Sequence, residues 1–83
     1  MSEPAERLIK RAIAKVLNEK GELDEKPIRD FVKNETGHGG RKTKTYLDEM
    51  VGAKEVAKRG RELPKKLKTT YILNDRGRER IRA

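Results

Sequence analysis

The sequence contains no cysteine and a single histidine, and these two absences exclude several kinds of site. Without cysteine the chain forms no disulfide bond and offers no thiolate to a zinc ion. His38 is the one soft metal ligand, and a zinc site needs three or four protein ligands. We therefore interpret His38 as a turn residue and predict a protein that holds no metal and no cofactor.

Long apolar runs and aromatic residues are also scarce. Apolar residues make up 33% of the 83 residues and charged residues 43%, so the core must be small. No apolar run approaches the length of about 18 residues that spans a membrane. The opening residues MSEPAERL lack the apolar segment of a signal peptide. We predict one intracellular domain over residues 1–83, frayed at 1–3 and 82–83, with no membrane partner.

Lysine and arginine are abundant, and they are unevenly distributed. The chain has 22 basic and 14 acidic residues, a net charge of +8. Residues 1–38 hold eight of each sign, whereas residues 39–68 hold ten basic and four acidic residues. A surface that is only solvated intersperses the two signs, so this asymmetry predicts one side that faces a polyanion. We expect nucleic acid there, and no feature of the sequence indicates a small-molecule substrate.

Apolar residues at helical spacing predict three helices. The first is capped by Ser2, has Pro4 in its first turn and ends at Gly21. After a short extended piece, Asp24 is placed to cap the second helix, which stops near residues 34–37. The third begins at about Arg41 and ends near residue 52, with its apolar side at Thr43, Leu47, Met50 and Val51.

Beyond residue 52 the pattern changes from helical to extended. The runs 54–59 and 68–74 are predicted strands of a hairpin with a long, flexible tip, because Gly60, Pro64 and a basic tract separate them. Asn74 or Asp75 then caps a short final helix, with Ile81 as its apolar anchor. The predicted fold class is α+β, with three helices, a hairpin and a carboxyl-terminal helix.

The glycines at 37, 39 and 40 raise the question of a nucleotide-binding loop. A P-loop needs a second glycine five residues after the first, followed by lysine. Counted from Gly37, these positions hold Lys42 and Thr43, and the preceding segment is a predicted helix instead of a strand. We therefore expect no nucleotide hydrolysis and no enzymatic activity. The glycines instead break the second helix and leave the next helix terminus open to a phosphate.

One face of the third predicted helix carries polar side chains. Arg41, Thr45 and Asp48 fall on the side opposite Leu47 and Met50. Cations, a hydroxyl and a carboxylate are the groups that read base edges in the major groove. The predicted DNA-binding residues of this segment are Gly39, Gly40, Arg41, Lys42, Lys44, Thr45 and Asp48. The alternative is a merely solvated helix face.

Three stretches, taken in order, resemble the winged helix-turn-helix family. GELDEKPIRDFV (21–32) is similar to the family's entry into its second helix. TKTYLDEMVGAKEV (43–56) matches its spacing of core positions, and TTYILNDRGRERI (69–81) resembles its last strand and exit helix. The chain departs from the family in a longer glycine-rich turn and in Lys54, which stands where these proteins often carry glycine.

The resemblance implies binding of double-stranded DNA, with the third helix in the major groove and residues 58–68 as a wing against the backbone or minor groove. The predicted wing contacts are Lys58, Arg59, Arg61, Lys65, Lys66 and Lys68. We expect a small transcription regulator of a microbe, virus or plasmid. Two alternatives stay open: a winged helix that binds RNA or the ribosome, and one that binds protein within a larger complex.

Two further expectations concern apolar surface. Tyr46 and Tyr71 border apolar positions, so we interpret them as core residues and not as platforms for stacked bases. The first helix has a broad apolar face, and the rest of the chain has few large residues to cover it. Part of this face is therefore expected to be left for a partner subunit in a homodimer. The apolar face consists of Leu8, Ile9, Ala12, Ile13, Val16 and Leu17.

Overall fold

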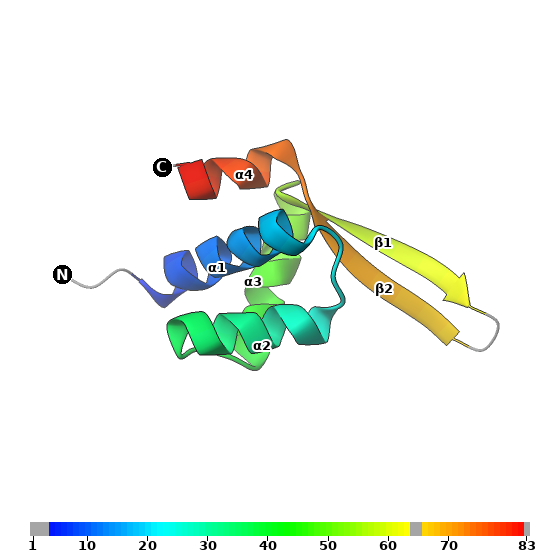
Figure 1. Cartoon of the computed structure of the whole chain (residues 1–83), viewed down its shortest axis with the longest axis horizontal. Helices are drawn as coiled ribbons and strands as arrows, with labels where there is room; N and C mark the ends of the chain where they lie inside the picture. The colour runs from blue at the N-terminus through cyan, green and yellow to red at the C-terminus, as the bar shows by residue number, and fades with distance from the viewer. Residues whose placement is uncertain (1–3, 64–65, 83) are drawn as a thin grey trace.

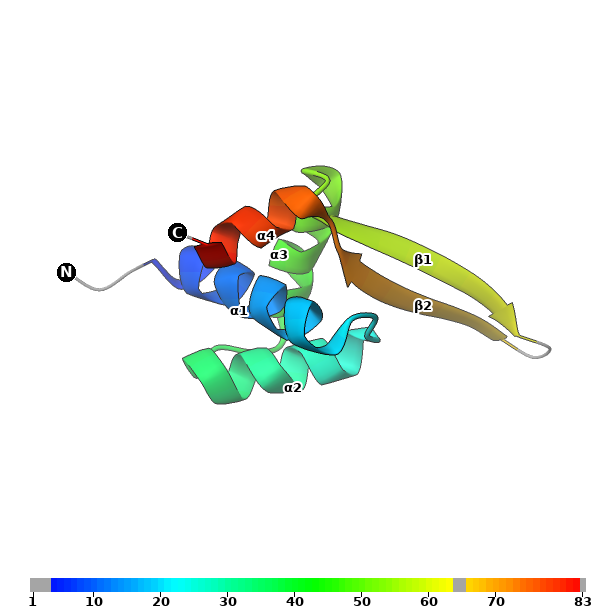
Figure 2. The ribbon, with the colours of Figure 1, turned by 45° about the horizontal axis from the view of Figure 1, so that its top comes forward.

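The computed structural model describes residues 4–63 and 66–82, and their side chains outside residues 61–68. Three helices are followed by two antiparallel strands and a fourth helix, as the sequence predicts. The elements are α1 (Ala5–Lys20), α2 (Glu25–Thr36), α3 (Arg41–Gly52), β1 (Val56–Leu63), β2 (Lys66–Leu73) and α4 (Asp75–Arg82). Figures 1 and 2 show α1 between α2 and α4, with α3 packed across them and the hairpin projecting away from the helices.

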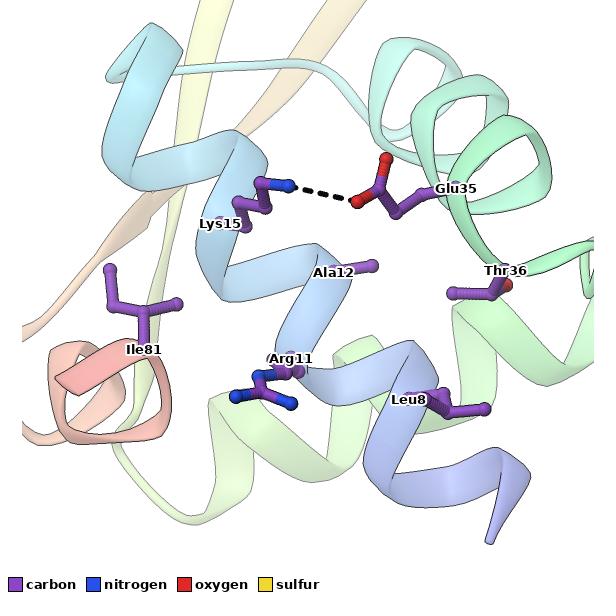
Figure 3. Close-up of a pocket in the computed structure, with 7 residues that line it drawn as sticks. All are labelled: Leu8, Arg11, Ala12, Lys15, Glu35, Thr36 and Ile81. Atoms are coloured by element: carbon purple, nitrogen blue, oxygen red, sulfur yellow. Dashed lines mark hydrogen bonds and ion pairs between the residues drawn. The ribbon is translucent and has the colours of Figure 1, made fainter. Parts of the chain in front are cut away.

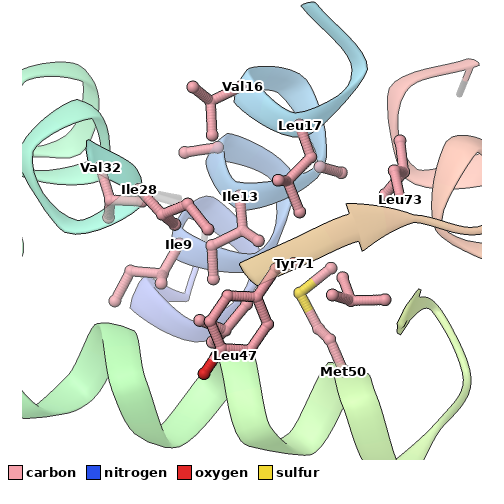
Figure 4. Packing of buried hydrophobic residues seen from close by; sticks show 13 residues of the cluster. Ile9, Ile13, Val16, Leu17, Ile28, Val32, Leu47, Met50, Tyr71 and Leu73 are labelled. Atoms are coloured by element: carbon pink, nitrogen blue, oxygen red, sulfur yellow. The ribbon is translucent and has the colours of Figure 1, made fainter. Parts of the chain in front are cut away.

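Helix α1 is central to the fold because its apolar side is covered by the other elements. Ile9 and Ile13 are fully buried, and they meet residues of α2, α3 and β2 (Figure 4). The buried apolar residues are Ile9, Ala12, Ile13, Ala14, Val16, Leu17, Ile28, Val32, Leu47, Met50, Val56, Tyr71 and Leu73. Of the predicted apolar face of α1, five residues are therefore buried within the chain and Leu8 is half-buried, so the part left uncovered is small.

The ends of the helices follow the predicted signals closely. Pro4 is the residue before α1 and does not lie within its first turn as predicted, and Ser2 lies outside the described residues. Gly21 and Gly37 end α1 and α2 with φ of 86° and 77°, a backbone conformation that glycine adopts without a steric penalty. Asp24 precedes α2 as predicted but makes no side-chain capping hydrogen bond.

The hairpin is longer than the sequence predicts. Its strands pair from Val56 opposite Leu73 to Leu63 opposite Lys66, so the predicted long tip is wrong. Each strand forms hydrogen bonds with its partner along the whole ladder, and these offset the weak strand preference of the basic tract. The predicted extended piece at Leu23 is confirmed, because Leu23 and Tyr71 exchange backbone hydrogen bonds of 3.1 and 2.8 Å. This bridge ties the hairpin to the entry of α2.

The carboxyl-terminal helix is fixed to the junction between α3 and β1. The Asn74 N–H donates to the Glu55 carbonyl at 2.9 Å, and the Asn74 amide donates to the Lys54 carbonyl at 3.0 Å. Arg80 donates to both carboxylate oxygens of Glu55, whose side chain is buried. Lys54 has a φ of 63°, so the structure needs a left-handed residue at the place where the related proteins often carry glycine.

Candidate nucleic-acid interface

Helix α3 has one buried side and one exposed side. Thr43, Leu47 and Met50 are fully buried against the core. The five predicted contact residues on the other side, Arg41, Lys42, Lys44, Thr45 and Asp48, are all exposed. The predicted division of this helix is therefore confirmed, although exposure by itself does not test what these side chains bind.

The amino terminus of α3 is open. Gly40 precedes the helix with φ 72° and ψ −133°, and as a glycine it has no side chain to cap the first N–H groups. The first turn contains no acidic residue. Free N–H groups and the positive end of the helix dipole favour an anion here. Gly39 packs closely on α2, because an added Cβ would lie 3.3 Å from Lys33 Cβ.

The turn before α3 is held by the side chain of Thr36. The Thr36 hydroxyl donates to the Val32 carbonyl at 2.7 Å and accepts from the His38 N–H at 3.1 Å. The interpretation of His38 as a turn residue is confirmed by this contact. Among residues 4–63 and 66–82, no group of three or more acidic or histidine side chains is arranged to hold a metal ion.

Lys44 is paired with carboxylates, a feature that sequence reasoning missed. Its Nζ lies 3.4 Å from Glu25 Oε1 at the start of α2 and 3.7 Å from Asp48 Oδ2, one turn along α3. The hydrogen bond to Glu25, followed by the charges of Asp48 and Glu25, raises the pKa of Lys44. The Asp48 contact could have been found from the i, i+4 spacing, but the Glu25 contact depends on how α2 crosses α3.

The wing continues the basic surface away from the helices. Lys58 and Arg59 of β1 are exposed, and Arg59 lies 3.8 Å from Glu22 Oε1. Arg61, Lys66 and Lys68 belong to the paired strands, while Lys65 lies outside the described residues. The structure thus places the described wing cations along two strands instead of in a flexible loop.

The two tyrosines belong to the core, as predicted. Tyr71 is 2% exposed, and its hydroxyl is directed toward α3 (Figure 4). Burial raises the pKa of Tyr71, and the nearby charge of Lys44 opposes this rise. Tyr46 is half-buried and packs on the edge of the core. Tyr71 is therefore too enclosed to stack on a base.

A separate groove lies on the other side of α1 (Figure 3). It has a volume of 570 Å³, and α1, α2 and α4 supply its lining, with no residue from α3 or the hairpin. Leu8, Ala12 and Ile81 form its apolar part, and Lys15 pairs with Glu35 at 2.8 Å across it. The groove is thus distinct from the basic surface of α3 and the wing.

Comparison with known proteins supports the fold described above. No protein-family model matches the sequence, and no curated protein sequence does. The structure matches that of Bacillus subtilis PadR in complex with operator DNA, with a TM-score of 0.72 and 26% identity over 92% of this chain. The chain is a winged helix-turn-helix domain. It spans 45% of the PadR chain.

In a winged helix-turn-helix domain, α2 and α3 correspond to the helix-turn-helix, and β1 and β2 form the wing. Leu23 pairs with β2 through an isolated bridge to Tyr71. The matched PadR structure contains operator DNA. No helix in the described part of the chain is both long and apolar enough to cross a membrane.

Proposed function

We propose that this winged helix binds double-stranded DNA in a sequence-specific way and acts as a small transcription regulator inside the cell. The observation that carries the proposal is the exposed polar face of α3, which adjoins an open helix terminus and a basic wing. The similarity to PadR, whose structure contains operator DNA, supports it. No catalytic role is proposed for any residue.

The exposed face of α3 suits the major groove. A helix fits this groove, and arginine and lysine there donate to guanine O6 and N7. Arg41 and Lys42 lie in the first turn of α3, where the recognition helix of such domains approaches base edges. Thr45 is turned back toward its own helix, because its hydroxyl donates to the Arg41 carbonyl at 3.0 Å. We therefore propose that Thr45 contacts DNA through its methyl group.

The open terminus and the wing suit the phosphate backbone. N–H groups beside Gly39 and Gly40 hold a phosphate without adding side-chain bulk, which sets the position of α3 in the groove. The wing cations Lys58, Arg59, Arg61, Lys65, Lys66 and Lys68 add attraction that does not depend on sequence. We propose that specificity comes from α3 and most of the affinity from the wing.

A homodimer through α1 stays a prediction, and the apolar surface available for it is smaller than the sequence indicates. The exposed apolar part of this face consists of Leu8 and the groove it shares with Ile81. A two-fold dimer would place two recognition helices about one turn of DNA apart. Sedimentation of the protein, free and on DNA, tests it. A species of 9.5 kDa at high micromolar concentration in both samples would contradict the dimer.

The experiment for DNA binding compares a mixed-sequence DNA duplex, an RNA duplex and a DNA single strand at one salt concentration. We expect the DNA duplex to bind most tightly. If about five cations meet phosphates, log affinity falls with log salt at a slope of about −4 to −5. A slope shallower than about −1 would contradict binding to a polyanion. A preference for the RNA duplex would indicate the RNA-binding alternative, and no binding would indicate a protein partner.

A further inference from the structure

Glu25 joins the two helices of the helix-turn-helix through their charges. Its carboxylate lies 3.1 Å from Arg29 NH1 on its own helix and 3.4 Å from Lys44 Nζ on α3. The Glu25 side chain is 28% exposed, so it is partly sheltered between these two cations. A partly exposed ion pair contributes little to stability. We therefore consider how the charge of Glu25 affects the binding of ligands to Lys44.

The starts of α2 and α3 differ in charge. Asp24 and Glu25 stand at the amino end of α2, whereas the first turn of α3 has no acidic residue. A carboxylate near a helix amino terminus is stabilised by the dipole, and its negative charge repels a phosphate there. The amino terminus of α3 can therefore accept a phosphate, whereas the acidic side chains at the amino terminus of α2 repel one.

Lys44 lies beside the acidic start of α2. Of the three exposed cations near the start of α3, Arg41 and Lys42 have no ion pair within the described part of the chain, whereas Lys44 is placed between Glu25 and Asp48. A phosphate that approached Lys44 would carry its charge close to both carboxylates, well within the Debye length of about 8 Å at physiological salt. A base edge carries no net charge, so the carboxylates would not repel it in this way.

We propose that Glu25 is a specificity-determining residue, which keeps Lys44 from binding phosphates at random and reserves it for a neutral acceptor on a base edge. The inference rests on the proposed DNA binding and adds to it a residue outside the recognition helix. Every DNA sequence presents phosphates, so a contact between Lys44 and a phosphate would raise non-specific affinity. By disfavouring this contact, Glu25 would increase the ratio of specific to non-specific affinity.

The test uses Glu25→Gln, which keeps the shape of the side chain and removes its charge. We expect affinity for a mixed-sequence duplex to rise about three- to tenfold at low salt. The salt slope should steepen by about 1, because Lys44 gains a phosphate. Affinity for a site selected from random duplexes should rise less, so that the ratio of specific to non-specific affinity falls.

Glu35→Gln is the matched control. It removes one negative charge from the other end of α2 and breaks an ion pair of 2.8 Å with Lys15, in a part of the molecule that lines the separate groove. Both variants change the net charge equally. We expect Glu35→Gln to leave the salt slope and the specificity ratio unchanged.

A Lys44→Ala background makes the test decisive. In that background Glu25→Gln should give no gain in non-specific affinity beyond that of Glu35→Gln, because the effect requires the lysine. Equal effects of the two substitutions, or a gain that persists without Lys44, would overturn the role of Glu25 while the wild-type protein still binds duplex DNA. A wild-type protein that binds no duplex DNA would overturn the proposed function and this inference together.

Discussion

The ammonium group of Lys10 lies 5.6 Å from the centre of the Tyr46 ring, and this contact joins α1 to α3. The same nitrogen lies 2.8 Å from Glu6 Oε1 and 3.5 Å from Glu49 Oε1. Burial lowers the pKa of Lys10, but the two carboxylates raise it by more, so the net shift is upward. With a side chain 11% exposed, Lys10 is a sheltered cation that holds α3 on the core.

The Lys10 pairing predicts a specific loss of stability in acid. The hydrogen bond from Lys10 holds the pKa of Glu6 below its ordinary value of 4.5. Below pH 4.5 the unfolded chain then binds more protons at this site, so the contribution of Glu6 is complete above pH 4.5 and is lost as the pH falls through the folded pKa. Lys10→Met should remove part of this pH dependence.

Urea unfolding of the wild type and of Lys10→Met at about pH 6 and about pH 3 measures the effect. The difference in free energy of unfolding between the two proteins should be smaller at the lower pH. Lys20→Met, which removes an exposed cation from the same helix, is the control. A difference between wild type and Lys10→Met that is equal at both pH values would contradict the role assigned to Glu6.

The helices could be predicted from the sequence because their signals are local. Apolar spacing and the glycines at 21, 37 and 40 set the ends of α1, α2 and α3 within a few residues. The length of the wing could not be predicted in this way. Gly60 and the basic tract are poor strand formers, and the ladder beyond Gly60 depends on pairing with β2.

The candidate site shows the same division. The exposed face of α3 follows from the helical period, since Thr43, Leu47 and Met50 must face the core. The position of Glu25 beside Lys44 depends on how two helices cross, which no spacing in the sequence specifies. How little of the apolar face of α1 stays uncovered could not be predicted for a related reason, because coverage depends on how closely α2, α3 and α4 pack around it.

The buried side of α3 contains a polar group without a partner. Thr43 is fully buried, and its Oγ1 makes no hydrogen bond within the described part of the chain. Valine has nearly the same shape and no hydroxyl to desolvate. Thr43→Val should therefore raise the free energy of unfolding by about 1 kcal/mol, measured by denaturant unfolding. Thr43→Ala, which leaves a cavity, should lower it, and a loss of stability in both variants would show that the hydroxyl is satisfied.

The turn before α3 predicts different effects at its two adjacent glycines. Gly40 combines a φ of 72° with open space around its missing side chain, so strain of the backbone is the only penalty there. Gly40→Ala should lower the free energy of unfolding by about 1 to 3 kcal/mol. At Gly39 the φ is not in the left-handed region, and an added Cβ would lie 3.3 Å from Lys33 Cβ, a contact that a shift of a few tenths of an ångström relieves. Gly39→Ala should cost less, and the reverse order would contradict the observed turn.

The wing predicts a loss of affinity that is independent of DNA sequence. Lys58 is exposed on β1, and wing cations contact phosphates more than bases. Lys58→Ala should weaken specific and mixed-sequence duplexes alike and make the salt slope shallower by about 1. The double substitution Lys65→Ala, Lys66→Ala should also weaken binding to both kinds of duplex equally. Binding titrations at several salt concentrations measure this, and a selective loss for one sequence would assign base reading to the wing.

Substitution of Arg41, on the exposed side of α3, is the most direct test of sequence specificity. Arg41 is exposed in the first turn, and its guanidinium donates to guanine O6 and N7 if α3 enters the major groove. Arg41→Ala should cost about 1 to 3 kcal/mol of binding free energy at a selected site and much less on a mixed-sequence duplex. Arg82→Ala is the control, because Arg82 is an exposed arginine at the far end of α4. A folded Arg41→Ala, Lys44→Ala protein that kept its full preference for the selected site would exclude α3 as the reading surface. A loss of that preference in Arg82→Ala instead would move the reading surface to the arginine-rich end of the chain.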